Sequence, residues 1–522
     1  MKKFFALLPP FLFTFVSILF LYFNTSTTIA PIEMFRPLAW MIFFVALFIF
    51  PTYLLTKNWH LTGLLLTIFV FGFYYEQIIF LFVVSSAGAI LFLWFFLSKI
   101  RHKKIQLEDV TLLLNFLGFL LILGGGVKLA LPVANLPKSY YEGIKIRDNP
   151  IVLKPQKEKP DIYYIVLDGY ARSDVLQALY GYDNSNFISY LQNKGFVVPN
   201  NIHSNYPKTS LSIPSTLNMN YIQELTPGLE ESHFWWLMSP LIDHSQVRTM
   251  LDDLGYESVS LATDWTITNN KTTDLYYQPA SVQISEFEKH ILYNTPLSLT
   301  LPSIDRIAYL PTSNAGHREM VLYNFETLPQ IARLSGPQFI FAHIISPHPP
   351  FVFDKNGNNI NSNKPFSFND GEGFRNGSKA YISVTERNEI YRTGYIGPVE
   401  FINKELKSVI DAILKNSDTP PIIILQADHG SGLYADFSSS ENTCMYERFS
   451  PFAAYYLPDI DPNIISDDLT SVNLFRIIFN EYFDADLPLL ENAYFFSTDP
   501  FYVYEFEEIS INRINAPCNI QP

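Results

Sequence analysis

Cysteine and charge are both scarce in this sequence. Two cysteines in 522 residues exclude a disulfide-rich scaffold and a cysteine-based zinc module. Only 16% of the residues are charged, whereas soluble domains average about 25%, so part of the chain is expected to lie in lipid. The net charge of −14 argues against nonspecific nucleic-acid binding, which requires a basic surface. These shortages indicate a membrane-tethered protein with a sizeable globular part.

The few charges are divided unevenly along the chain. Residues 1–135 contain nine Lys or Arg and four Asp or Glu, a balance of +5 that leaves −19 for the rest. This basic part holds five apolar runs, at about 4–23, 38–56, 60–75, 77–98 and 111–131. Each run is near the length of about 17–25 residues that crosses the hydrocarbon core of a bilayer as a helix. We therefore predict an α-helical membrane bundle of five spans over residues 1–131.

Basic residues predict how these spans are oriented. Lys2 and Lys3 precede the first run, Lys57 lies between the second and third, and four basic residues within 99–104 separate the fourth from the fifth. With five spans, all three groups fall on one side, which the positive-inside rule assigns to the cytoplasm. Everything after about residue 132 is then expected outside the cytoplasmic membrane.

The acidic remainder of the chain has the pattern of an α/β domain. Residues 132–160 carry scattered charges and several prolines and are predicted to be a linker, so the domain covers 161–522. Four short apolar runs have the composition of buried strands: Asp161–Leu167, Gly255–Ala262, Gln338–Ile345 and Pro421–Gln426. Helical spacing occurs at Ser185–Lys194, His244–Leu254, Ile402–Lys415 and Ser471–Phe483. Apolar strands separated by helices favour a largely parallel central sheet with helices on both faces.

Three of the predicted strands end in residues that can bind ligands. Asp168 follows the first strand, His348 follows the strand that contains His343, and Asp428-His429-Gly430 follows the last. Ligands bind beyond the carboxyl ends of parallel strands. A lone Asp after a strand is usually a helix cap, but capping does not explain the imidazole next to Asp428. Asp168, Asp428 and His429 together offer the oxygen and nitrogen ligands suited to one divalent metal, Zn²⁺ or Mn²⁺.

A cluster of hydroxyl groups lies between the first and second of these strand ends. The segment from Thr209 to Ser215 (TSLSIPS) has the composition of a helix start, and its hydroxyls admit two interpretations. They can be ordinary N-caps, or one can be a nucleophile at a helix N-terminus, where free N–H groups favour a phosphate. A bound metal would lower the pKa of such a hydroxyl. Because successive helical residues differ by about 100°, Thr209, Ser210 and Ser212 cannot face the metal equally.

The order of these motifs resembles the alkaline phosphatase superfamily. The motifs are Asp-Gly, then Thr-x-x-Ser-x-Pro, then Pro-His, then Asp-His-Gly. Within the superfamily, the chain is similar to the sulfatase-like membrane transferases, namely lipoteichoic acid synthases and lipid A phosphoethanolamine transferases. The resemblance covers essentially the whole chain, and it implies five membrane helices followed by an extracytoplasmic α/β domain of the alkaline phosphatase/sulfatase type.

The resemblance also implies roles for individual residues. Thr209 matches the nucleophile, at the position where those transferases hold a phosphorylated threonine. Asp168 matches their first-strand acidic ligand, which is usually Glu, and Asp428 and His429 match their Asp-His ligand pair. Thr209 would thus be both nucleophile and metal ligand. His348 matches a substrate-side histidine that contacts the phosphate or protonates the leaving group.

The sequence departs from the family pattern in several places. His343 lies five residues before His348 on the same predicted strand and can be a packed neighbour or part of the site. A full second metal site is not expected, because the soluble part has no Asp-x-x-x-His and no histidine after His429. Cys444 and Cys518 can form one bridge in an oxidising compartment, but the sequence leaves their pairing open. With two cysteines, this chain cannot form the several disulfides that the phosphoethanolamine transferases have.

These observations favour a membrane-anchored, metal-dependent phosphotransferase. The expected donor is a phospholipid whose headgroup phosphate, of the phosphoglycerol or phosphoethanolamine type, passes through phosphothreonine to an envelope glycan or glycolipid acceptor. The partners are thus lipid, glycan and membrane, with no nucleic acid. A first alternative is a hydrolase of phosphate or sulfate esters, although Ser212–Thr216 lacks the arginine of the sulfatase C/S-x-P-x-R motif. A second alternative is a degenerate scaffold or sensor without turnover.

Overall fold

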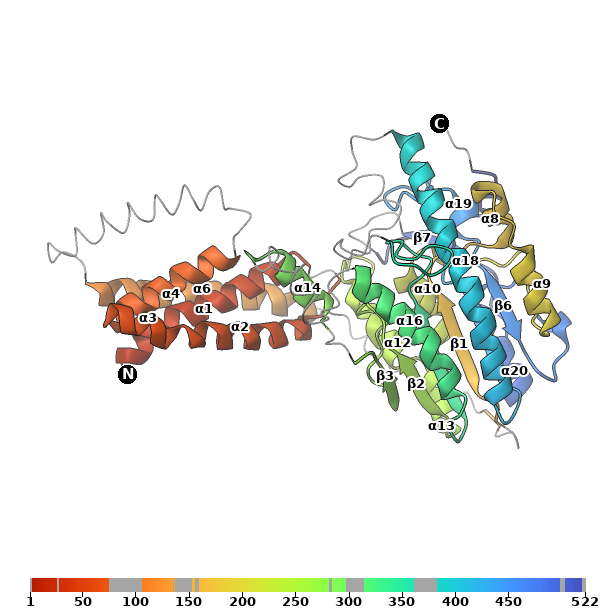
Figure 1. Ribbon diagram of the computed structural model, residues 1–522, viewed down its shortest axis with the longest axis horizontal. Helices are drawn as coiled ribbons and strands as arrows, with labels where there is room; N and C mark the ends of the chain where they lie inside the picture. The colour runs from red at the N-terminus through yellow and green to blue at the C-terminus, as the bar shows by residue number, and fades with distance from the viewer. Residues whose placement is uncertain are drawn as a thin grey trace. The chain divides into compact units, whose positions relative to one another are not determined.

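The computed structural model describes most of the chain as two compact units (Figure 1). The described residues are 2–25, 28–74, 106–134, 136, 153–154, 159–280, 284–296, 314–360, 383–497 and 503–518. The first unit contains the described residues up to 136 together with 284–296, and the second contains the rest. Most of the predicted linker, 132–160, lies outside the described residues.

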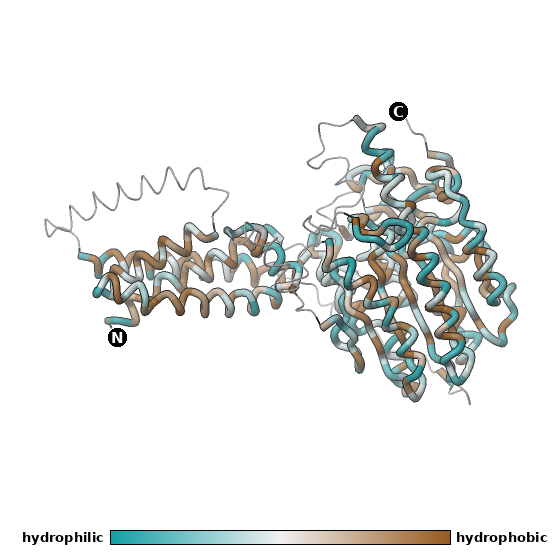
Figure 2. Tube along the Cα trace, in the orientation of Figure 1, coloured by the Kyte–Doolittle hydropathy of each residue, from teal (hydrophilic) through white to brown (hydrophobic). Residues whose placement is uncertain are grey.

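The first unit is a bundle of apolar helices. Its elements are α1 (Lys2–Phe23), the 3-10 helix η1 (Pro31–Met34), α2 (Phe35–Leu47), α3 (Ile49–Thr56), α4 (Trp59–Tyr74) and α6 (Leu107–Ala134). Helix α1 packs against α2, α4 and α6. Large side chains such as Trp40, Leu55 and Phe116 are more than half exposed, and Figure 2 shows the apolar character of these helices. Exposed apolar surface of this extent is typical of helices that contact lipid.

Three segments of this unit are long and apolar enough to cross a membrane. They are Lys3–Phe23, Pro31–Thr56 and Leu107–Leu131, which correspond to the first, second and fifth predicted spans. The third predicted span forms α4, an apolar helix of 16 residues, and the fourth, 77–98, lies outside the described residues. Three of the five predicted spans therefore form helices that could cross a membrane, whereas the count of five and the orientation remain predictions.

A helix from much later in the chain also packs in this unit. Helix α14 (Glu286–Tyr293) buries Phe287 and Ile291 in the same apolar cluster as Tyr22, and the rings of Tyr22 and Phe287 lie 5.9 Å apart. At its start, Glu288 forms an ion pair with Arg36. The predicted domain 161–522 includes residue 286, but these contacts group α14 with the apolar helices.

The second unit is built on a six-stranded sheet in the order β3-β2-β4-β1-β5-β6. The strands are β1 (Ile162–Leu167), β2 (Glu257–Leu261), β3 (Leu275–Tyr277), β4 (Gln338–Ile344), β5 (Ile422–Gln426) and β6 (Ala453–Tyr456). All neighbours pair in parallel except β5 and β6, which are antiparallel. The predicted largely parallel sheet is thus confirmed, and all four predicted strands form. The edge strands β3 and β6 were not predicted.

Helices cover both faces of this sheet (Figure 1). One face packs against α8 (Ser173–Tyr180), α9 (Ser185–Asn193), α16 (Asn314–Ile331) and α18 (Val384–Asn416) through one core cluster. On the other face lie α10 (Thr209–Asn218), α12 (Ser239–Asp243), α13 (Gln246–Asp253) and α20 (Leu474–Phe483), where Tyr164 of β1 contacts Phe475. The shorter described elements are α11 (Ile222–Leu225), η3 (Trp235–Met238), α19 (Met445–Arg448), η5 (Pro462–Ile464), η6 (Ser471–Asn473), β7 (Phe495–Ser497), β8 (Phe506–Glu508) and α21 (Ile511–Ile514).

The strand register places the polar strand ends at one edge. Leu167, the last residue of β1, pairs with Ile344 of β4, and Val166 pairs with Gln426 of β5. Because these three strands are parallel neighbours, their carboxyl ends meet at the same edge of the sheet. The residues that follow them are thereby brought together although they are up to about 260 positions apart.

Candidate active site

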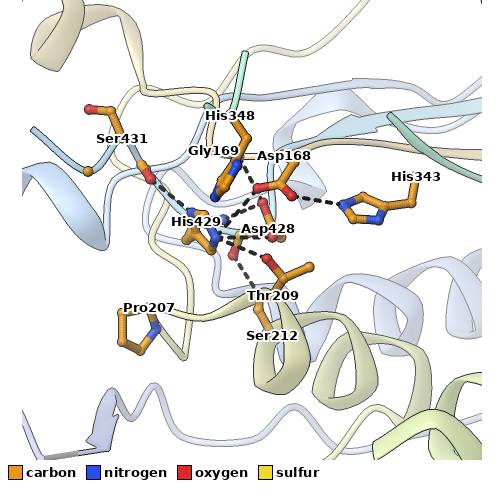
Figure 3. Close-up of polar contacts among 12 residues, drawn as sticks. Asp168, Gly169, Pro207, Thr209, Ser212, His343, His348, Asp428, His429 and Ser431 are labelled. Atoms are coloured by element: carbon orange, nitrogen blue, oxygen red, sulfur yellow. Dashed lines mark hydrogen bonds and ion pairs between the residues drawn. The ribbon is translucent and has the colours of Figure 1, made fainter. Parts of the chain in front are cut away.

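Two aspartates and one histidine converge at this edge of the sheet (Figure 3). Asp168 follows β1 directly, and Asp428 and His429 follow β5. Each residue offers one ligand atom, and these three atoms lie within 4.8 Å of one another. All three residues are buried. In the described ranges, no second group of three or more His, Cys, Asp or Glu has comparable spacing.

The imidazole of His429 is fixed with its unprotonated Nε2 toward the cluster. Its Nδ1 lies 2.9 Å from the carbonyl oxygen of Gly430, which can only accept, so Nδ1 carries the proton. Its Nε2 is 3.3 Å from Asp428 Oδ2 and 3.6 Å from Asp168 Oδ1. This is the tautomer that a histidine uses to ligate a metal through Nε2.

The carboxylates leave one oxygen each without a donor. Asp428 Oδ1 accepts hydrogen bonds of 3.0 Å from the backbone N–H groups of Gly169 and His429. Asp428 Oδ2 and Asp168 Oδ1 are buried and have no hydrogen-bond partner among the described residues. Burying unpaired carboxylate oxygens costs several kcal/mol unless a cation offsets the charge. The free carboxylate oxygens and the imidazole nitrogen fit one divalent cation held by Asp168, Asp428 and His429.

Histidines around Asp168 keep it ionised. Burial alone raises the pKa of Asp168, but the neighbouring imidazoles of His348, His343 and His429 lower it below the usual range of an aspartate. One of these is His343, whose Nε2 lies 3.4 Å from Asp168 Oδ2. The hydroxyl of Thr268 lies 2.8 Å from His343 Nδ1 and fixes the ring. His343 therefore lies next to the carboxylate of Asp168.

Thr209 places its hydroxyl beside the same cluster. It is the first residue of α10, and its Oγ1 lies 3.1 Å from His429 Nε2. The two other hydroxyls of this turn are placed differently: Ser212 donates to the carbonyl of Asp428 at 2.6 Å, and Ser210 is fully buried. The N-terminal turn of α10 also presents backbone N–H groups, which favour an anion.

His348 lies beside Asp168 and His429 (Figure 3). Its backbone N–H donates to the carbonyl of Asp168 at 3.1 Å, and its Nδ1 lies 2.5 Å from the carbonyl of Pro349. It is only partly buried, unlike Asp168 and His429. The structure thus brings together all five residues that the sequence analysis selected.

Two cations near Thr209 were missed by the sequence analysis. Arg448 in α19 places its Nη2 3.1 Å from His429 Nε2. Lys208 immediately precedes Thr209 and is also buried. No local pattern marks either residue, because Arg448 reaches the site only through the packing of a four-residue helix against the loop after β5.

The family model described as sulfatase matches residues 160–478 of this chain. The chain belongs to the sulfatase family. Its matched residues cover β1 to β6, and they include every residue of the site described above. This match confirms the predicted family resemblance. It assigns the chain to the enzymes of the sulfatase family.

Several solved structures are similar to this sulfatase-family chain. The periplasmic domain of EptC from Escherichia coli, in complex with Zn, is 11% identical, with a TM-score of 0.42 over 67% of this chain and 92% of that chain. The periplasmic domain of the phosphoethanolamine transferase EptC from Campylobacter jejuni is 12% identical, with a TM-score of 0.38 over 63% and 90%. The integral membrane transferase EptA from Neisseria meningitidis is 13% identical, with a TM-score of 0.37 over 80% and 68%. No curated protein matches the sequence.

Proposed function

We propose that this protein is a membrane-anchored, metal-dependent phosphotransferase that moves a phospholipid headgroup phosphate to an envelope glycan or glycolipid through phosphothreonine. One observation carries the proposal: the hydroxyl of Thr209, at the start of α10, lies 3.1 Å from an imidazole that belongs to a cluster of buried carboxylates. A nucleophile, anion-binding N–H groups and the ligands for a cation thus share one edge of the sheet.

In the first half-reaction, Thr209 Oγ1 forms a bond to the phosphorus of the donor, and the bond from phosphorus to the diacylglycerol oxygen breaks. The hydroxyl proton leaves to solvent, and His348 supplies a proton to the departing oxygen. Asp168, Asp428 and His429 would hold Zn²⁺ or Mn²⁺, which supplies positive charge that lowers the pKa of the hydroxyl and stabilises the phosphate. The backbone N–H groups at the start of α10 orient the phosphate oxygens.

In the second half-reaction, an acceptor hydroxyl forms a bond to phosphorus, and the bond to Thr209 Oγ1 breaks. His348, which has released its proton, is placed to take the proton of the acceptor, and Thr209 regains a proton from solvent. The site can repeat the cycle because both steps use the same residues in opposite directions. Hydrolysis differs only in that water takes the place of the acceptor.

The setting of the site supports a lipid donor and an extracytoplasmic location. Three helices of the first unit can cross a membrane, so a donor lipid reaches the enzyme by lateral diffusion. Cys444 and Cys518 form a disulfide, and such bonds persist in oxidising compartments outside the cytoplasm. With the basic clusters on the cytoplasmic side, the second unit would face the outer leaflet.

Mass spectrometry of the full-length protein tests this function. The protein in detergent is incubated with Mn²⁺ or Zn²⁺ and a phospholipid extract, and peptides are searched for an adduct. We expect a headgroup phosphate on Thr209 together with release of diacylglycerol. Thr209→Ser should retain measurable adduct because the attacking oxygen survives, whereas Thr209→Ala should lose it.

Ser210→Ala is the matched control, since it removes an adjacent buried hydroxyl and should keep the adduct on Thr209. Near-normal turnover by Thr209→Ala would contradict the covalent route and favour direct attack by water. Release of free headgroup phosphate without an acceptor would identify a hydrolase. Absence of turnover with every lipid would indicate a catalytically degenerate protein.

A further inference from the structure

Two buried cations occur near the proposed nucleophile: Arg448 through its contact with His429, and Lys208 as the preceding residue. Lys208 is 8% exposed and Arg448 is 3% exposed. Arg448 Nη2 and Thr209 Oγ1 each lie 3.1 Å from His429 Nε2, so these two atoms are no more than about 6 Å apart. A phosphate attached to Thr209 would therefore have its substituents next to the guanidinium. The sequence resemblance assigned no role to either cation.

Arg448 is held in this place by backbone carbonyls on both sides of the site. Its Nε donates to the carbonyl of Pro207, just before the nucleophile helix, at 2.7 Å. Its Nη1 donates to the carbonyls of Gly430 and Ser431, just after the aspartate-histidine pair, at 3.2 and 3.4 Å. The guanidinium thus joins the nucleophile loop to the loop after β5. A planar group with donors fixed in this way presents its charge in one direction.

Lys208 and Arg448 share an aromatic neighbour. The ring of Phe437 lies 4.9 Å from Arg448 Cζ and 5.6 Å from Lys208 Nζ, and the ring of Trp235 lies 4.9 Å from Lys208 Nζ. Both rings are only partly buried, whereas the cations are buried beneath them. A face of each ring that could receive a substrate ammonium therefore already holds a cation of the protein.

The net charge of the site does not favour binding of a further cation. In formal charge, Asp168, Asp428 and Glu447 sum to −3 and Lys208 and Arg448 to +2, so a divalent metal would leave the site at +1. Glu447, which precedes Arg448, is buried and accepts four hydrogen bonds. These come from the Ser431 hydroxyl at 2.6 Å, the Leu433 and Tyr434 N–H groups at 2.8 Å, and the Tyr180 hydroxyl at 2.9 Å. A phosphodiester supplies the missing negative charge, whereas an ammonium on its headgroup would add positive charge again.

We infer that the donor carries a neutral polyol headgroup, as in a phosphoglycerol lipid, and that Lys208 and Arg448 select against an ammonium headgroup. The inference rests on the proposed function, because it concerns what Thr209 receives. In phosphatidylethanolamine, only two carbons separate the ammonium from the phosphate oxygen, so it would lie close to Arg448 and to the Phe437 ring that Lys208 also contacts. Like charges at short range in a poorly solvated site repel strongly. Glycerol hydroxyls carry no charge and can accept hydrogen bonds from both side chains.

Donor competition with the full-length protein tests the inference. The protein in mixed micelles with Mn²⁺ is given phosphatidylglycerol or phosphatidylethanolamine of identical acyl chains, and diacylglycerol release is measured. We expect phosphatidylglycerol to react at least about tenfold faster. Equal rates, or faster release from phosphatidylethanolamine, would overturn the headgroup inference and leave the phosphotransferase proposal standing. Release from neither lipid would contradict both.

A charge variant shows whether the two cations are responsible. Lys208→Met keeps an unbranched side chain against Trp235 and removes the charge, so the ratio of the two rates should fall at least about threefold. Lys407→Met is the matched control, because Lys407 also lies over an aromatic ring, 5.3 Å from that of Tyr190, but in the contact between α18 and α9. The control should keep the wild-type ratio. An unchanged ratio in Lys208→Met would refute the role of Lys208.

A binding experiment gives a second reading that does not depend on turnover. The EDTA-treated full-length protein is titrated by calorimetry with glycerol 3-phosphate and with O-phosphoethanolamine. Without metal, the remaining cations should bind glycerol 3-phosphate at least about fivefold more tightly. Equal or tighter binding of phosphoethanolamine would overturn the inference whether or not Lys208→Met folds.

Discussion

Replacing Gly430 with alanine should both destabilise the protein and weaken metal binding at the site. Gly430 follows His429, and a Cβ built on it would lie 1.9 Å from the carbonyl oxygen of Glu447 and 3.1 Å from that of Ser450. Both obstacles are backbone atoms, so no side-chain rotation can relieve the contact. The glycine is required here by the close approach of α19 to the loop after β5.

The size of the effect follows from this geometry. Contacts below 3.0 Å are essentially never seen for a Cβ, so one of the two segments must shift by about 1 Å. Overpacking of this kind costs about 1–3 kcal/mol of unfolding free energy. The same shift moves the carbonyl of Gly430, which accepts from His429 Nδ1 at 2.9 Å and from Arg448 Nη1 at 3.2 Å. Loss of such supporting hydrogen bonds lowers metal affinity about 10- to 100-fold.

Calorimetric titration with Zn²⁺ and thermal unfolding by circular dichroism measure both effects on the full-length protein in detergent. Gly181→Ala is the control, because Gly181 has φ of 65° after α8 and nothing within 4 Å of its built Cβ. That variant should lose about 1–2 kcal/mol through backbone strain and bind metal normally. Wild-type Zn²⁺ affinity in Gly430→Ala would refute the argument that this close approach positions His429.

Three further predictions concern other parts of the chain. Burial raises the pKa of Asp161 to about 6, so the folded state holds this proton more tightly than the unfolded state does. Stability should therefore fall as the pH rises from about 4 to 6, and Asp161→Asn should remove this part of the slope in thermal unfolding measured across that range. Cys518→Ser opens a link between residues 74 positions apart and should lower the unfolding free energy by about 2–4 kcal/mol in denaturant titrations; an unchanged midpoint would contradict a structural role for the bridge. A reporter fused after residue 140 should be active only outside the cytoplasm, and cytoplasmic activity would also remove the lipid-headgroup mechanism.

Much of the fold was predictable because its signals are local. The four predicted strands are short apolar runs, and β1, β4 and β5 are buried along their whole length, so no polar face obscured them. The edge strand β3 has three half-buried residues, which leave too little pattern to recognise. Strand β6 was missed although it is longer, since its Ala-Ala-Tyr-Tyr sequence has no clear strand period.

The site was partly predictable for a related reason. Asp168, Asp428 and His429 each follow a recognisable strand, and a parallel sheet brings such strand ends to one edge. Arg448 has no comparable signal, because it lies 19 positions after His429 and points to it from another element. The grouping of α14 with the apolar helices was equally hidden, since the apolar residues of an eight-residue helix do not reveal which core they enter.

The position of α14 limits how this protein can be divided. The chain leaves the sulfatase-family unit after β3, contributes Phe287 and Ile291 to the apolar helices, and returns to begin α16. A truncated chain that starts at residue 161 would keep α14 but lose Tyr22, Arg36 and the other side chains that cover it. Such a fragment would expose the apolar residues of α14 to water and would tend to aggregate. A soluble fragment therefore requires removal of α14 as well as of the N-terminal helices.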